Sequence, residues 1–171
     1  MEMSEPALYV MAKPPPELHP ELCFRRSAHG LSEHYAIARR HCTMLNLGFA
    51  RNWAPPQLAR LREELGALYF DPFDVVFDEI RDRALRGRKG MPAPAAFHRA
   101  LRRVAQRCGV ELSQRNFRLH LSLAYQGTGV PRTRIDPISW RVEEFQLVLS
   151  DHGHTLLGRW PLVERQYALA L

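Results

Sequence analysis

Cysteine is scarce in this sequence. Of the 171 residues only three are cysteines, Cys23, Cys42 and Cys108, and no two of them form a CxxC pair. An odd and widely spaced set excludes the disulfide framework of a small secreted protein and gives none of the usual zinc-binding spacings. We therefore interpret the three thiols as small apolar side chains in a reducing compartment.

Long apolar runs are also missing. No segment approaches the ~20 apolar residues that a membrane-spanning helix needs. The N-terminal stretch carries Glu2 and Glu5 where a signal peptide would have basic residues. Dinucleotide-binding GxGxxG, P-loop and HExxH motifs are absent as well. We expect a cytoplasmic protein, monomeric by default, with no membrane contact, no metal and no cofactor.

Lysine is nearly absent, although the chain is basic. Lys13 and Lys89 are the only lysines among 24 basic residues, and the net charge is +6 with a pI of about 9.7. Arginine's planar guanidinium suits bidentate phosphate binding, and a basic protein attracts polyanions. The same bias would follow from a GC-rich genome, so charge alone leaves both interpretations open.

The apolar pattern predicts an α+β protein that forms one domain over residues 1–171. Helices are expected at 20–30, from Pro55 and from Pro94, where prolines precede apolar stripes of helical spacing. The segment Arg81–Gly90 is predicted to be a loop or hairpin tip, and Asp151–His154 a turn. Strands are expected at Leu8–Ala12, Cys42–Leu47, Phe73–Ile80, Phe117–Tyr125, Val142–Ser150 and Thr155–Val163. Alternation of strands with helices favours antiparallel sheet with the helices packed outside, in two similar halves.

One short pattern occurs twice, each time on a predicted strand. His41-Cys-Thr-Met and His120-Leu-Ser-Leu both read histidine, any residue, hydroxyl, apolar. Residues two apart on a strand point to the same face, so each histidine projects together with its hydroxyl, Thr43 or Ser122. The other six histidines lack a hydroxyl two residues later. A chance match is unremarkable once, but the duplication favours a shared site over two ordinary strand histidines.

Two imidazoles and two hydroxyls suit phosphoryl chemistry. A neutral imidazole can take a proton from the attacking oxygen while a protonated one gives a proton to the leaving oxygen. Histidine is suited to both tasks because its pKa lies near working pH. The hydroxyls of Thr43 and Ser122 can hydrogen-bond the non-bridging phosphate oxygens.

The sequence here resembles the two-histidine (2H) phosphoesterases, in particular the bacterial RNA 2',3'-cyclic phosphodiesterase, or 2'-5' RNA ligase, family. The resemblance rests on Tyr35-Ala-Ile with His41–Gly48, on Asn116–Ala124 and on Gly158–Leu162. It implies two pseudo-symmetric lobes of antiparallel sheet, with outer helices, around a central basic cleft. It further implies metal-independent hydrolysis of RNA 2',3'-cyclic phosphate ends to 2'-phosphates, with reversible 2'-5' joining of RNA ends at the same site. The resemblance does not settle which histidine is the acid; we assign His41 to the leaving 3' oxygen and His120 to water.

Further residues are candidates for substrate binding. Arg39 and Arg118 each stand two residues before a motif histidine and are expected on its face; the basic segment Arg81–Lys89 would add a rim of charge. As single residues these arginines are also compatible with solvated surface positions. Aromatic side chains that could stack a base, or simply fill the core, are Phe49, Trp53, Tyr125 and Trp160. His152 and His154 flank a glycine, where a solvated hairpin tip is favoured over a metal site.

Two other functions remain open. The same two-histidine site could act on a small cyclic or 2'-5' linked nucleotide, and the chain could be a non-catalytic RNA-binding module of this fold. The basic stretch favours polymeric RNA, and the paired imidazoles favour an enzyme, because binding alone does not need them.

Overall fold

The computed structural model describes residues 5–34, 36, 39–112 and 116–164. Their strands form one eight-stranded antiparallel sheet with the order β6-β3-β4-β5-β2-β1-β7-β8. Tyr35 and Ile37, which carried part of the family resemblance, lie outside the described residues. The strands are β1 (Ala7–Ala12), β2 (Cys42–Phe49), β3 (Phe73–Asp82), β4 (Ala84–Gly87), β5 (His120–Ser122), β6 (Val130–Val142), β7 (Glu144–Ser150) and β8 (His154–Pro161).

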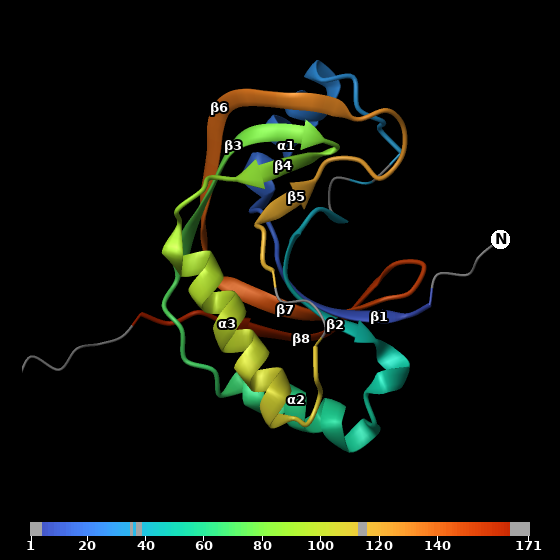
Figure 1. Ribbon diagram of the computed structural model, residues 1–171, viewed down its shortest axis with the longest axis vertical. Helices are drawn as coiled ribbons and strands as arrows, with labels where there is room; N and C mark the ends of the chain where they lie inside the picture. Colours follow the sequence, from blue (N-terminus) through green and yellow to red (C-terminus); the bar gives the residue numbers. More distant parts are fainter. Residues whose placement is uncertain (1–4, 35, 37–38, 113–115, 165–171) are drawn as a thin grey trace, which may run out of the picture.

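The sheet divides into two halves at the junction between β2 and β5. These two strands are joined by a single paired position, Cys42 opposite Leu121. In Figure 1 the strands β6, β3, β4 and β5 form the upper half, and β2, β1, β7 and β8 form the lower half. The two motif strands are therefore the inner edges of the two halves, and the predicted α+β fold with two sheet lobes is confirmed.

Three α-helices lie outside the sheet in the described residues: α1 (His19–Ala28), α2 (Pro55–Gly66) and α3 (Pro92–Arg107). Each has proline in its first two positions, where the missing N–H costs nothing. Along the chain α1 connects β1 to β2 and α3 connects β4 to β5, so the two motif strands are reached through equivalent helices. No helix among these residues is long and apolar enough to cross a membrane.

The apolar stripes predicted for α2 and α3 form the core. Leu61 and Leu65 of α2 are buried, and Phe97 and Leu101 of α3 are fully buried against β2 and β3. Gly109 follows α3 with a positive φ of 78°, which allows the chain to leave the helix. The start of α3 is at Pro92, two residues earlier than expected.

The prediction of a loop or hairpin tip at 81–90 was wrong in part. The segment contains the end of β3 and the strand β4, which pairs with β3 and β5. Ala84 and Leu85 are buried, whereas the arginines around them are not. The basic side chains of one face hid the strand pattern in the sequence.

The longest strand, β6, was not predicted. It pairs with β3 along its length and ends the sheet. Pro131 and Pro137 obscured it, but an edge strand tolerates proline because one side of its backbone faces no partner. Only its last part buries alternate residues, Ile138, Trp140 and Val142. The strand expected at 117–125 is limited to His120–Ser122.

Candidate functional site

The two motifs meet at the junction between the halves of the sheet. Cys42 and Leu121 are paired directly and fully buried, so these middle residues of the motifs face the core. The flanking residues therefore face the opposite side, where His41, Thr43, His120 and Ser122 are half-buried and line one cleft. The convergence expected from the sequence pattern is present in the structure.

Both motif histidines are held by the same local hydrogen bond. The Nδ1 of His41 lies 2.9 Å from the carbonyl oxygen of Arg39, and the Nδ1 of His120 lies 3.0 Å from that of Arg118. A carbonyl oxygen can only accept, so each Nδ1 must carry a hydrogen. In the neutral ring Nε2 is then the free acceptor, and in the charged ring it is a donor. The backbone thus fixes ring orientation and tautomer alike at both motifs.

The cleft has a volume of about 460 Å³ and is built mainly from strands of the lower half. Met11 of β1 pairs directly with Thr43 of β2, and both line the cleft. Tyr9, which the sequence did not indicate, lies two residues before Met11 on the same face. Ser150 and His154, paired across the hairpin of β7 and β8, complete this wall.

Besides His152 at its exposed rim, the cleft is lined by a fourth histidine, His154. Its ring contacts that of His41 edge-on, with 5.2 Å between the ring centroids and 68° between the planes. The solvated tip expected for this residue was therefore wrong, although His152 beside it is exposed. Sequence spacing gave no signal for the contact, because it depends on β7 and β8 returning alongside β1. Nowhere in the described residues do three or more histidine, cysteine or acidic side chains cluster as they would around a metal ion.

The surroundings of His41 disfavour its charged form. Burial lowers the pKa of His41 to about 4, against the partial opposing effect of the Arg39 carbonyl. The charges of His154, Lys13 and His120 act in the same direction as burial. Burial also lowers the pKa of His154, helped by Lys13 and Arg39. His41 is consequently neutral near pH 7, with its Nε2 able to accept a proton.

A buried arginine ties the two motif strands together. Arg40, immediately before His41, has only 1% of its surface exposed. Its Nη2 donates a 2.7 Å hydrogen bond to the carbonyl oxygen of Leu123, which directly follows Ser122. A charged hydrogen bond of this kind, out of contact with water, fixes one motif relative to the other.

The model of the 2'-5' RNA ligase superfamily matches residues 14–154. The chain belongs to this superfamily. Comparison with curated protein sequences found no significant match.

Solved structures share the fold. E. coli LigT complexed with 3'-AMP superposes with a TM-score of 0.75 at 22% identity, covering 94% of this chain and 100% of LigT. A crystal structure described as a phosphoesterase gives the same four values. A protein of Thermus thermophilus matches with a TM-score of 0.63 at 18% identity, covering 91% of this chain and 97% of its own. At these identities the likeness establishes the fold.

The two arginines that the sequence predicted for substrate binding lie in different hollows of this superfamily member. Arg39 lines the cleft with His41, as expected. Arg118 lines instead a neighbouring groove over β3, β4 and β6, which has no lining residue in common with the cleft. The expectation that Arg118 shares the face of His120 assumed a regular strand, but β5 begins only at His120. Arg118 therefore does not belong to the histidine cleft.

Of the four aromatic candidates for base stacking, only Tyr125 lines the cleft, half-exposed. Phe49 is at the far end of β2, under the guanidinium of Arg51, and does not line it. Trp53 is buried, and its indole N–H donates to the carbonyl of Leu47. Trp160 packs on Phe145 in the core. Trp53 and Trp160 are therefore structural, whereas Phe49 is exposed outside the cleft.

Proposed function

We propose that the protein hydrolyses RNA 2',3'-cyclic phosphate ends to 2'-phosphates. The observation that carries the proposal is the matched pair of histidines beside two hydroxyls in one cleft. Each histidine bonds a backbone carbonyl through its Nδ1, and its Nε2 has no hydrogen-bond partner among the described residues. The reaction requires one group that removes a proton from the attacking oxygen and one that supplies a proton to the leaving oxygen. Two imidazole rings held in fixed tautomers can perform these two tasks. The family membership supports the same chemistry.

The reaction proceeds by attack of water on the cyclic phosphorus. The new P–O bond forms as the bond from phosphorus to the 3' oxygen breaks, leaving the phosphate on the 2' oxygen. One imidazole takes a proton from the water, and the other gives a proton to the 3' oxygen, so that one water is added overall. Thr43 and Ser122 donate hydrogen bonds to the non-bridging oxygens as their charge changes.

The lowered pKa of His41 supports the reverse of the assignment made from the sequence. A histidine with a pKa of about 4 is neutral in the free protein and can accept the proton of water directly. We therefore assign His41 as the base and His120 as the acid that protonates the 3' oxygen. The negative charge of the bound phosphate stabilises the imidazolium once it forms.

A small nucleotide is the alternative substrate. LigT has been crystallised with 3'-AMP, with NADP+ and with ATP, so a related cleft accommodates nucleotides. The paired histidines argue against a purely binding role, since binding does not require two positioned proton carriers. Reversible 2'-5' ligation at the same site, the monomeric state and the cytoplasmic location remain predictions.

The deciding experiment uses a short 5'-labelled RNA that ends in a 2',3'-cyclic phosphate, incubated with the protein in EDTA. We expect a product with one added water that co-migrates with a 2'-phosphate standard and separates from the 3'-phosphate. Each of the variants His41→Gln and His120→Gln should abolish conversion and retain RNA binding. His29→Gln is the matched control. The Nδ1 of His29 also bonds a backbone carbonyl, that of Arg25, but His29 directly follows α1 and does not line the cleft.

Full activity in either motif variant would contradict the mechanism. No conversion of the RNA by folded protein, with turnover of a nucleoside 2',3'-cyclic phosphate, would select the small-nucleotide alternative. Binding of RNA with no turnover of either substrate would select the non-catalytic module.

A further inference from the structure

A second hollow, of about 640 Å³, lies beside the histidine cleft, and we call it the basic groove. Its floor is formed by β3, β4 and β6, and the first turn of α3 and the residues before β5 close one side. Seven basic and two acidic side chains line it. The basic residues are Arg81, Arg86, Arg88, Lys89, Arg118, Arg132 and Arg134.

Strand pairing places the groove directly next to the cleft. Arg86 of β4 is the paired position of His120 of β5, and Ala84 is that of Ser122. Residues paired directly across antiparallel strands project on the same face, with their Cβ atoms about 5 Å apart. Arg86 therefore stands beside the motif histidine, one strand further along the same face. A polymeric ligand whose end is bound in the cleft can therefore continue into the groove.

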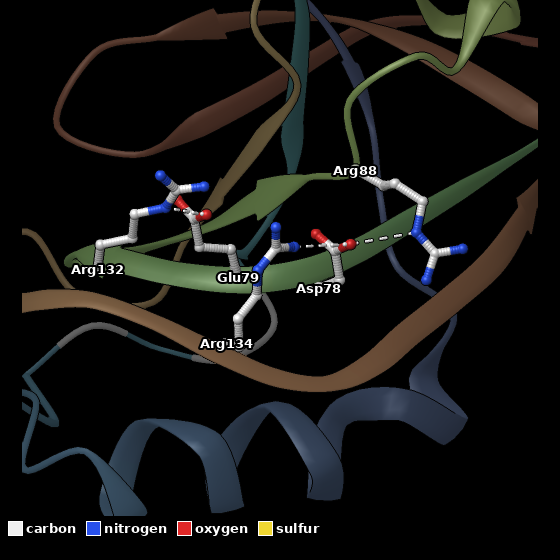
Figure 2. A network of polar contacts seen from close by, with 5 residues as sticks. All are labelled: Asp78, Glu79, Arg88, Arg132 and Arg134. Atoms are coloured by element: carbon white, nitrogen blue, oxygen red, sulfur yellow. Dashed lines mark hydrogen bonds and ion pairs between the residues drawn. The ribbon is translucent and has the colours of Figure 1, made fainter.

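The two acids of the groove are already neutralised. A bulge in β3 between Phe77 and Glu79 interrupts the strand alternation, so that Asp78 and Glu79 both reach arginines (Figure 2). The carboxylate of Asp78 lies 3.2 Å from the guanidinium groups of both Arg88 and Arg134, and the carboxylate of Glu79 lies 2.6 Å from that of Arg132. These ion pairs hold Arg88, which follows β4, and Arg132 and Arg134 of β6 in place beside β3.

Four other basic residues line the groove. Within the described part of the chain, Arg81, Arg86, Arg118 and Lys89 form no ion pair, and the Nε of Arg86 is buried without a hydrogen-bond acceptor. Burial lowers the pKa of Arg86, and the charges of Arg81 and Arg118 add to that effect against the attraction of Asp82 and Glu79. The three guanidinium groups therefore lie close enough to repel one another, an arrangement that a bound anion relieves.

The N-terminal end of α3 adds to the positive potential of the groove. The N-cap residue Met91 lines the groove together with Pro94 and Ala95 of α3, and Met91 provides no side-chain cap. The first turn contains no acidic residue. The positive end of the helix dipole is thus left uncompensated at the groove.

We propose that the basic groove binds the phosphodiester backbone of the nucleotides that precede the cyclic phosphate, so that the preferred substrate is an RNA strand rather than a mononucleotide. This inference rests on the proposed function and adds the residues that bind the rest of the RNA strand. Several neighbouring guanidinium groups suit successive phosphates, which carry no sequence information. Single-stranded backbone is recognised by such positively charged grooves without base readout.

The test measures kcat/KM for two substrates, an octaribonucleotide that ends in a 2',3'-cyclic phosphate and a nucleoside 2',3'-cyclic phosphate. The ratio of the first value to the second is compared between proteins. The wild type should favour the octamer. Arg81→Gln, Arg86→Gln and Arg118→Gln should each lower this ratio on the order of tenfold, because one charged hydrogen bond to phosphate is removed. The salt dependence of the octamer's KM should become less steep, by about 0.7 in the logarithmic slope for each phosphate that the variant no longer neutralises.

Arg62→Gln serves as the matched control. Arg62 is exposed on α2 and lines neither hollow. If Arg62→Gln lowered the ratio of the two kcat/KM values as much as the groove variants do, the proposal would be wrong, because the effect would then come from the overall charge of the protein. Equal kcat/KM for octamer and mononucleotide in the wild type would also overturn the proposal, and would leave an acidic protein segment as the occupant to test.

A binding measurement separates this inference from the proposed function. A fluorescent octaribonucleotide ending in a 3'-phosphate is titrated with protein, and its anisotropy gives Kd without any turnover. Weaker binding by Arg81→Gln and Arg118→Gln but not by Arg62→Gln supports the groove even if no cyclic phosphate is hydrolysed. Unchanged Kd in both groove variants contradicts the groove even if hydrolysis is confirmed.

Discussion

The protonation of His41 is the most direct physical test of the site. The structure places its pKa at about 4, chiefly because burial penalises the charged ring. Relative to the ordinary value of 6.5, this corresponds to a cost of ~3 kcal/mol for charging the ring in the folded protein. At pH 5.5, an ordinary histidine is about nine-tenths protonated, whereas His41 should be protonated in roughly one molecule in thirty.

The measurement is a side-chain NMR titration of protein labelled with 15N-histidine, with the resonances assigned from the spectrum of His41→Gln. We expect the His41 ring to remain in its Nδ1–H tautomer down to pH 5 and to change only near pH 4. In kinetics, the same group as a base predicts that kcat/KM falls as the pH decreases through about 4. A titration midpoint near 6.5 would refute the electrostatic argument and remove the support for His41 as the base.

The lowered pKa of His41 also makes the free energy of unfolding depend on pH. Because the folded pKa of His41 is below the unfolded value, the unfolded chain binds more protons between pH 6.5 and 4, and stability falls as the pH decreases through that window. After allowance for solvent screening of a half-buried ring, we expect a loss of about 1 to 3 kcal/mol, measured by denaturant unfolding at several pH values. His41→Gln lacks this titration and should lose correspondingly less; an identical pH dependence in the two proteins would contradict the reasoning.

Three further outcomes are expected. Thr43→Ala and Ser122→Ala should each lower kcat on the order of ten- to a thousandfold with little change in RNA affinity, the scale of one hydrogen bond made to the transition state; loss of affinity alone would assign the hydroxyls to ground-state binding. Arg40→Met should destabilise the fold by about 1 to 3 kcal/mol in urea unfolding, because the carbonyl of Leu123 is left buried without its donor; no change in stability would show that water replaces the guanidinium. Turnover of the cyclic phosphate should be unaffected by EDTA, and loss of activity restored by added metal would contradict the two-histidine mechanism.

Helices α2 and α3 could be predicted from the sequence, whereas the strand β6 could not. The leucines of α2 and Phe97 and Leu101 of α3 recur at helical spacing, and their burial follows from that period alone. β6 has no such period, because most of it lies at the sheet edge with both faces polar. Its position is decided by pairing with β3, which no local pattern encodes.

The motif residues were accessible to sequence reasoning for a similar reason. A spacing of two on a strand fixes which side chains share a face, so His41 with Thr43 and His120 with Ser122 could be paired from their spacing alone. Which residues of different strands meet is set by register and by the return of distant segments. His154 reaches His41 only because β8 folds back beside β7, and Arg86 reaches His120 only because β4 pairs with β5.

The sequence by itself determined which side chains of the candidate site share a face, because histidine and hydroxyl side chains two residues apart on a strand project together. The tertiary structure decided the environment of that chemistry: the burial that keeps His41 neutral, and the separation of Arg118 and its neighbours into a groove of their own. Burial and electrostatic potential are sums over all surrounding atoms, and those atoms come from segments far apart in the chain.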